Sequence, residues 1–179
     1  SMSSLPAHGV PIVGVESRLV DDSGEVMHND GSTIGELQIR GTTMFDEYLN
    51  RPDATAASFD DGWFRTGDAA VIDDGGFHRI VGRQSIDIIK TGGFKVGAGE
   101  VEAALLTHPG VTEAAVIGVS DPDLGQRIVA FVVGDAVDAA TLINHVAALL
   151  SVHKRPREVR LVDVLPRNAM GKVQKTLLS

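Results

Sequence analysis

Three positions in the sequence carry charged side chains in settings where they could act on a nucleotide. Asp68 closes the run Trp63–Asp68, and a carboxylate accepts two hydrogen bonds side by side, which matches the vicinal hydroxyls of a ribose. Arg83 follows a glycine at the end of an apolar segment, and Lys172 follows a glycine in the flexible loop Pro166–Lys172. Each also has an ordinary explanation: a carboxylate that caps a turn, a surface ion pair and a solvated lysine. The residues alone leave both sets of explanations open.

Several common catalytic patterns are absent from the sequence. Gly171-Lys172 resembles the end of a phosphate-binding P-loop, but Pro166 stands where that motif needs its first glycine. There is no Gly-x-Ser-x-Gly elbow, no cysteine and no metal-ligand spacing among the six histidines, so we expect neither thiol chemistry nor a metal site. Gly97-Ala98-Gly99 opens an expected helix and fits either an anion site or a tight strand-to-helix turn.

Composition and charge argue against further classes of protein. The net charge of −8 argues against nucleic-acid binding. Residues 152–179 nevertheless hold seven basic and two acidic residues, which suits a small polyanion such as a nucleotide and equally a solvated face. The longest apolar run, Ile128–Val133, is far shorter than the roughly 20 residues that span a bilayer, so we expect no transmembrane segment. The lack of cysteine and of a basic-then-apolar leader favours a cytoplasmic protein, and Ser1-Met2 resembles a tag-cleavage scar.

The elements that must position these residues fall into two groups. Residues 1–80 are rich in Gly and Asp, and their short apolar segments are separated by turn signals such as Asp73–Gly76, which predicts strands joined by hairpin-type connections. A short helix capped by Asp53 is expected over Asp53–Ser58. The expected strands are Val13–Val20, Gly35–Arg40, Ala69–Ile72 and Phe77–Val81.

After Gly82 the pattern changes to a mixture of strands and helices. Helical apolar spacing predicts helices over Gly99–Thr107 and Ala139–Leu150, and a terminal helical turn is expected over Gln174–Leu178. The expected strands are Ile86–Lys90, Phe94–Val96, Val111–Val119, Arg127–Val133 and Val159–Val162. The sequence therefore predicts an α+β protein in which a β-rich piece precedes a compact α+β domain, with a boundary near Gly82–Asp87.

Four segments, taken in order, resemble the motifs of the adenylate-forming superfamily of acyl-CoA synthetases, luciferases and peptide-synthetase adenylation domains. Together they cover nearly the whole sequence, and four ordered motifs are far more specific than any one of them. The segments are Gly35–Gly41 with Tyr48–Pro52; Gly62–Asp68; Gly82-Arg83 with Lys90–Val96 and Glu100–Glu102; and Pro166–Lys175. The resemblance implies the C-terminal portion of a ligase that uses ATP, Mg²⁺ and coenzyme A (CoA) with a small carboxylic acid.

The resemblance also implies roles for single residues in the first half-reaction. Asp68 would bind the ribose hydroxyls of ATP, and Arg83 would contact the ribose and phosphate side of the same nucleotide. Lys172 would be the catalytic lysine that reaches the α-phosphate and the substrate carboxylate during adenylation, where a positioned cation offsets the negative charge that accumulates.

In the second half-reaction the family's C-terminal domain rotates, and the resemblance implies that the Gly92-Gly93 loop then approaches the pantetheine arm of CoA. Weaker candidates for CoA phosphate contacts are Lys95, Lys154 and Arg155. Counting forward from Arg83 places the hinge at Ser85, whereas counting back from the glycine pair places it at Asp87.

The implied domains are an incomplete large domain, a hinge and a mobile domain. Residues 1–82 would be the β-rich, distorted barrel-like C-terminal part of the large AMP-binding domain, residues 83–88 the hinge, and residues 89–179 a small mobile α+β domain. The family's phosphate-gripping loop belongs to an N-terminal portion of the same chain, which we expect as the missing partner. The fragment alone is therefore expected to be inactive.

The segment Ile86–Glu102 is most similar to the malonyl-CoA synthetase branch, which implies malonate or methylmalonate as the acid, within fatty acid and lipid metabolism. A fatty-acyl-CoA ligase is the alternative. An adenylation domain that loads a carrier protein and an oxidative luciferase-like enzyme also stay open, as does a non-enzymatic module that recruits a partner.

Overall fold

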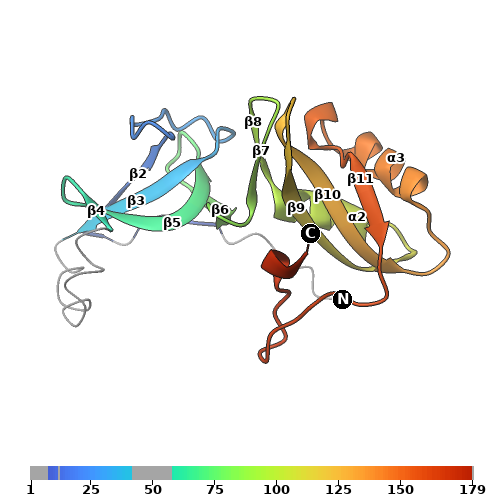
Figure 1. Cartoon of the computed structure of the whole chain (residues 1–179). Helices are drawn as coiled ribbons and strands as arrows, with labels where there is room; N and C mark the ends of the chain where they lie inside the picture. The colour runs from blue at the N-terminus through green and yellow to red at the C-terminus, as the bar shows by residue number, and fades with distance from the viewer. Residues whose placement is uncertain (1–7, 12, 42–57, 179) are drawn as a thin grey trace. The chain divides into compact units, whose positions relative to one another are not determined.

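The computed structural model describes residues 8–11, 13–41 and 58–178. The chain divides into two compact units, Ser1–Gln84 and Ser85–Ser179, which we call unit 1 and unit 2 (Figure 1). The helix expected over Asp53–Ser58 lies, except for Ser58, outside the described residues, as does the Tyr48–Pro52 motif. The predicted α+β class is confirmed, with strands in both units and two α-helices in the described part of unit 2.

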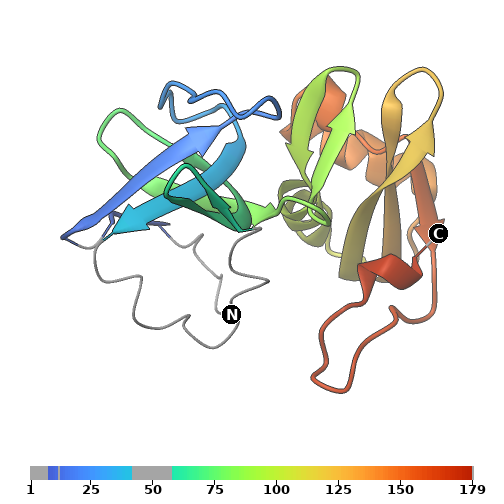
Figure 2. The ribbon, with the colours of Figure 1, turned by 60° about the vertical axis from the view of Figure 1, so that its left-hand side comes forward.

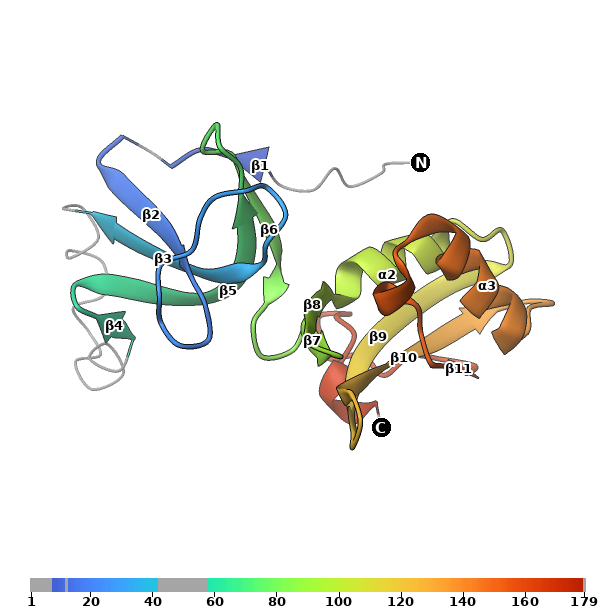
Figure 3. The same cartoon turned by 90° about the horizontal axis from the view of Figure 1, so that it is seen from above.

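Unit 1 is an antiparallel sheet in the order β1-β6-β5-β3-β2, with β4 paired to β5. Its strands are β1 (His8–Gly9), β2 (Val15–Val20), β3 (Gly35–Gly41), β4 (Phe59–Asp60), β5 (Trp63–Ile72) and β6 (His78–Arg83). In the described part of the chain β1 lies at one edge of the sheet and β2 at the other, where Val20 also bridges to Val26. The sheet is open and curved, like half of a barrel (Figure 3). Its small core consists of Leu19, Leu37, Ala70 and Ile72, with Met27 and Ile39 packed against them.

Unit 2 contains a five-stranded sheet in which β10 pairs with β9 and β7 in antiparallel fashion and with β11 in parallel fashion. The elements are β7 (Ile88–Thr91), β8 (Phe94–Gly97), α2 (Ala98–Leu106), β9 (Val111–Asp121), β10 (Gly125–Gly134), α3 (Ala139–Leu149), a 3-10 turn (Val152–Lys154), β11 (Glu158–Leu161) and a second 3-10 turn (Lys175–Leu177). Each element predicted after Gly82 is present, with its ends shifted by a few residues.

The strand β10 explains how unit 2 forms two layers. Its residues Ile128, Ala130 and Val132 join the core that α2 and α3 cover, whereas Val129 and Phe131 point to the opposite face. Successive side chains of a strand alternate between the two faces of the sheet, so the continuous apolar run buries both. Figures 1 and 3 show both helices on one face of this sheet.

The second face of the unit 2 sheet is covered by the end of the chain. Leu165 is buried against Val129 and Phe131, and Val173 and Leu178 pack beside it. Between these contacts the chain leaves the sheet as a loop and returns to the terminal 3-10 turn (Figure 2). The loop that carries Lys172 is thus anchored at both of its ends by apolar burial.

Two leucines at the ends of the helices are exposed rather than packed against the sheet. Leu106 ends α2 and is 49% exposed, and Leu149 ends α3 and is 53% exposed. Both lie in the last turn, where the helix leaves the sheet. Among the described residues, no helix combines the length and the apolar composition that crossing a membrane requires.

Candidate functional site

In unit 1, Asp68 and Arg83 lie opposite each other on the paired strands β5 and β6. The Arg83 Nε atom is 3.2 Å from Asp68 Oδ1, and Arg83 Nη1 donates a 3.0 Å hydrogen bond to the carbonyl oxygen of Thr66. About a third of the Asp68 side chain is exposed (32%), and 59% of the Arg83 side chain. The two residues that the sequence proposed for a nucleotide therefore form one accessible, ion-paired cluster.

The backbone around Asp68 differs from the predicted turn before a strand. β5 already begins at Trp63, so Asp68 lies inside the strand, and the sequence prediction of its position was wrong. Gly67 has a φ of +72°, which glycine adopts without steric cost, and it lies at an irregularity of the ladder to β3 rather than at a chain reversal. Thr66 Oγ1 accepts the Asp68 N–H (3.0 Å) and donates to the carbonyl oxygen of Leu37 (2.8 Å).

In unit 2, Gly92 and Gly93 form the two-residue turn of the β7–β8 hairpin, between the paired residues Thr91 and Phe94. Their φ values of +55° and +83° are those of a type I′ turn, which strongly favours glycine. A Cβ atom on Gly93 would meet no atom within 4 Å, whereas one on Gly92 would lie 3.6 Å from the Leu124 side chain. The outer surface of Gly93 is thus open to a ligand.

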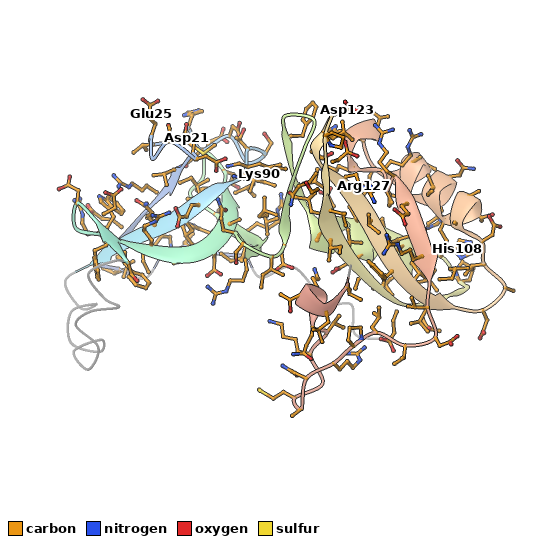
Figure 4. All side chains as sticks on the ribbon, viewed as in Figure 1. Asp21, Glu25, Lys90, His108, Asp123 and Arg127 are labelled. Atoms are coloured by element: carbon orange, nitrogen blue, oxygen red, sulfur yellow. The ribbon has the colours of Figure 1, made fainter. Side chains whose placement is uncertain are left out.

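The turn is held to the β9–β10 connection by one backbone and one side-chain hydrogen bond. The Gly92 N–H donates to the Leu124 carbonyl oxygen (2.9 Å), and the Lys90 N–H donates to Gln126 Oε1 (2.8 Å). Asp121 Oδ1 in turn accepts the Leu124 N–H at 3.0 Å. Figure 4 marks Lys90 on β7, Asp123 at the β9–β10 turn and Arg127 on β10. No local sequence pattern marks Gln126, because its partner Lys90 lies 36 residues away.

Beside the glycine turn lies an aromatic pair that the sequence did not single out. The rings of Phe94 and His153 stack with centroids 4.1 Å apart and an interplanar angle of 15°, and Phe94 is 51% exposed. His153 adjoins Lys154, whose Nζ atom forms a 2.8 Å ion pair with Glu100. Of the three weaker CoA candidates, Lys154 is therefore partly neutralised, while Lys95 and Arg155 are both half-buried.

Lys172 lies on an arm, residues 166–174, that is a hydrogen-bonded hairpin and not an irregular loop. Arg167 and Val173 form an antiparallel bridge, and Asn168 Oδ1 accepts the N–H groups of Met170 and Lys172 at 3.0 and 2.9 Å. Gly171 has a φ of +80° at the tip, where the chain reverses. Arg167 also forms an ion pair with Glu113 on β9.

The Lys172 side chain is exposed, and it forms no ion pair within the described residues. The arm therefore presents an ammonium group to solvent on a defined backbone. Across the described residues, no three His, Cys, Asp or Glu side chains converge to hold a metal ion.

The two hinge candidates differ in their surroundings. Ser85 is exposed and is the first residue of unit 2. Asp87 is half-buried, and its Oδ1 atom lies 2.8 Å from Lys175 Nζ, so it takes part in a cluster that the sequence did not reveal. A cavity of about 240 Å³ has Ser85, Gln126 and Lys175 in its wall.

Comparisons with known proteins agree with this arrangement. Residues 100–172 match the model of the AMP-binding enzyme C-terminal domain. A mitochondrial malonate–CoA ligase of Bos taurus is 43% identical over 93% of this chain and 32% of its own length. The ATP-bound structure of MatB from Rhodopseudomonas palustris is 38% identical, with a TM-score of 0.78 over 95% of this chain and 34% of that one.

A third similarity is to o-succinylbenzoate CoA synthetase (MenE) from Bacillus subtilis, solved with its acyl-adenylate intermediate. It is 35% identical, with a TM-score of 0.79 over 94% of this chain and 34% of the other. The same enzyme has also been solved with ATP and a magnesium ion.

The α+β fold, together with these matches, defines the class of the chain as adenylate-forming enzymes. The chain belongs to the adenylate-forming superfamily and carries its AMP-binding C-terminal domain, and its relatives are malonate–CoA ligases and related acid–CoA synthetases. It spans about a third of the length of the relatives that it matches.

Proposed function

We propose that this chain provides the C-terminal part of an ATP-dependent acid–CoA ligase, in which a carboxylic acid, Mg·ATP and CoA give acyl-CoA, AMP and pyrophosphate through an acyl-adenylate. The observation that carries the proposal is the exposed ammonium of Lys172 on an ordered arm, in a chain that also holds the Asp68–Arg83 cluster. The residues fit their substrates by charge: a carboxylate for ribose hydroxyls and cations for phosphate oxygens.

In the adenylation step, the substrate carboxylate attacks the α-phosphorus of ATP and pyrophosphate leaves. Asp68 accepts the ribose hydroxyls, and Arg83, already beside it, faces the ribose and the phosphates. Lys172 supplies the cation where negative charge develops on the α-phosphate. The hydrogen-bonded hairpin of the arm limits the directions in which this amine can point. Mg²⁺ enters as part of the substrate, bound to the phosphates of ATP.

In the thioester step, the thiolate of CoA attacks the acyl carbonyl and AMP leaves. Gly92 and Gly93 fit this step because their turn lacks side chains and the space before Gly93 is open. Lys95, Lys154 and Arg155 are the candidates for the CoA phosphates, and Lys154 would exchange its ion pair with Glu100 for a phosphate contact.

We further propose that residues 1–82 belong to the large domain, residues 83–88 contain the hinge, and residues 89–179 form the mobile domain. The pivot is placed at Ser85 rather than at Asp87. Asp87 is bound into unit 2 twice, through Lys175 and through its carbonyl oxygen, which accepts the Ala98 N–H at 2.7 Å. Ser85 is exposed and free to change its backbone angles without breaking those bonds.

Malonate is the proposed acid, with methylmalonate next, because malonate–CoA ligases recur among the relatives of this chain. A panel of malonate, methylmalonate and fatty acids, followed by AMP release in the presence of CoA, tests the choice with a full-length ligase that contains residues 1–179. A cytoplasmic location is also proposed, although the bovine relative is named as mitochondrial. Cell fractionation separates the two locations.

The test of the function is Lys172→Ala in the same full-length ligase. Loss of a preorganised cation is expected to lower the rate of acyl-adenylate formation by about 10²–10³-fold. Thioester formation from supplied acyl-adenylate should stay close to wild type, because the amine serves only the first step. Met170→Ala is the matched control, since Met170 is 92% exposed on the same arm and carries no charge. Equal loss of both half-reactions in Lys172→Ala would contradict the proposal.

A further inference from the structure

A partly buried ion cluster joins three segments of unit 2 that are distant in sequence. Lys175 Nζ lies 2.8 Å from Asp87 Oδ1 and 2.8 Å from Glu102 Oε1. Asp87 precedes β7, Glu102 belongs to α2, and Lys175 begins the 3-10 turn that follows the arm. One cation therefore connects the base of the arm to two fixed points of the domain.

The cluster is largely shielded from water. The Lys175, Asp87 and Glu102 side chains are 14%, 27% and 20% exposed. Burial acts to lower the pKa of Lys175, but the negative charges of Glu102 and Asp87 and their hydrogen bonds outweigh it, so the pKa is raised above its ordinary value of 10.5. The stabilisation by these ion pairs is complete below pH 10.5 and is lost only as the pH rises through the higher folded-state pKa. The cluster is thus a permanent clamp in the neutral range and not a pH switch.

Both acidic partners are themselves fixed. Glu102 Oε1 also accepts the Val116 N–H of β9 at 2.8 Å, and the Asp87 carbonyl oxygen accepts the Ala98 N–H at the start of α2. The acids therefore belong to the framework of helix and sheet, and Lys175 is the side chain that the C-terminal segment contributes to them.

The position of Lys175 fixes the direction of the arm. Gln174, its neighbour, donates its N–H to the Pro166 carbonyl oxygen at 2.8 Å, which closes the hairpin directly above the clamp. From that point the Arg167–Val173 bridge and the Asn168 contacts carry the ordered backbone to Lys172. Lys175 is therefore connected to Lys172 through hydrogen-bonded backbone, three residues along the chain.

We propose that Lys175 is a positioning residue for the adenylation half-reaction: its ion pairs with Asp87 and Glu102 hold the 166–174 arm so that Lys172 is presented in one direction. Lys175 itself touches no substrate in this scheme. The proposal rests on the proposed function, since it gives Lys172 its role. Its structural part, the clamping of the arm, stands separately and is measured separately.

The kinetic experiment uses Lys175→Met and Lys175→Arg in the full-length ligase. Lys175→Met should lower the turnover number for acyl-adenylate formation by about 10–100-fold, as expected when a catalytic group is displaced by about 1 Å. Thioester formation from supplied acyl-adenylate should remain near wild type, and Lys175→Arg should restore most of the lost rate because it keeps the charge. Glu158→Gln is the control, because Glu158 forms ion pairs with Arg127 and Arg160 in the same unit but does not contact Lys175.

Hydrogen exchange on this chain gives the independent readout. The N–H groups of Lys172 and Gln174 are hydrogen-bonded within the arm, so Lys175→Met should accelerate their exchange while leaving the amides of β10 protected. If the arm amides exchange as in wild type, the clamp is refuted whatever the activity. If they exchange faster but adenylation is unchanged, or both half-reactions fall together, the positioning role is refuted.

Two further variants test the positioning role if Lys175→Met does not fold. Glu102→Gln and Asp87→Asn each leave one ion pair of Lys175 in place, and each should slow adenylation less than loss of the lysine. If the wild-type full-length ligase activates no acid, the proposed function is wrong. The hydrogen-exchange experiment would still show whether Lys175 clamps the arm.

Discussion

The two units place their candidate functional groups on different kinds of backbone. In unit 1, Asp68 and Arg83 lie on paired strands inside a sheet, with Asp68 flanked by ladder contacts on both sides. In unit 2, Gly93 lies at a hairpin turn and Lys172 on an arm beyond the last strand. In the proposed function, the groups that hold the nucleotide through both steps lie within a sheet. The groups proposed to act in one step only lie at the ends of hairpins, whose bases are fixed.

The difference extends to how each unit fixes its groups. Near Asp68 the contacts are short in sequence or lie within the sheet, as in the Thr66 hydroxyl that caps the Asp68 N–H. Near Lys172 the decisive contacts are long-range: Lys175 to Asp87 spans 88 residues, and Arg167 to Glu113 spans 54. If the comparison is right, substitutions at the hairpin ends and the arm of unit 2 should separate the two half-reactions, and substitutions in the unit 1 sheet should change stability or both steps together.

The largest effect in this comparison is expected from Gly93→Trp. An indole at the open face of the turn should obstruct the pantetheine arm and lower the thioester rate by about 100-fold or more, while adenylation continues. Gly93→Asn is the matched control, because asparagine tolerates the positive φ of +83° and adds little bulk. The two half-reactions are measured separately in the full-length ligase. A thioester rate in Gly93→Trp equal to that of Gly93→Asn would remove the turn from the CoA path.

A smaller effect is expected in the unit 1 sheet from Arg65→Met. Arg65 Nη2 lies 2.9 Å from Glu36 Oε2, and the Glu36 side chain is only 10% exposed. The hydrogen bond and the charge of Glu36 raise the pKa of Arg65, so the guanidinium keeps its charge. Removing Arg65 leaves a buried carboxylate unpaired, at a cost of about 1–2 kcal/mol, less than for a fully buried pair because the Arg65 side chain is 53% exposed.

Urea unfolding of the chain measures the Arg65→Met change. Arg40→Met is the control in the same sheet, because its partner Glu16 is 61% exposed and needs no such compensation. If Arg65→Met costs no more stability than Arg40→Met, the Arg65–Glu36 pair does not hold β5 to β3, and the sheet-based half of the comparison is weakened.

Much of this fold follows from local patterns, and the exceptions have identifiable causes. Apolar spacing located α2 and α3, and the run Ile128–Val133 was correctly predicted to be a buried strand. The start of β5 was missed because Gly67 suggested a turn, whereas the ladder to β3 tolerates it as an irregularity. The Lys175 clamp could not be found, because a lysine on a terminal segment shows no local sign of partners 73 and 88 residues away.

The smallest effect is expected at the start of helix α3, on the helical face of unit 2. A substitution there tests whether the stability of unit 2 can change while the rates of both half-reactions stay the same. Asp138 caps the helix: its side chain accepts the Thr141 N–H at 2.9 Å and the Thr141 hydroxyl at 2.6 Å. The Thr141 hydroxyl, followed by the backbone N–H groups, lowers the pKa of Asp138 below its ordinary 3.8. Asp138→Ala should therefore lower the unfolding temperature slightly at pH 7 and leave both half-reactions unchanged.

The lowered pKa of Asp138 predicts how the stability difference between wild type and Asp138→Ala changes with pH. A lowered carboxyl pKa contributes stability that is fully present above pH 3.8 and is lost as the pH falls through the folded-state value. The gap in unfolding temperature between wild type and Asp138→Ala should thus be the same at pH 7 and pH 5 and close below pH 3.8. Asp123→Ala, at the exposed β9–β10 turn, should show no such gap (Figure 4). A gap that persists in strong acid would mean that the cap acts through packing and not through its charge.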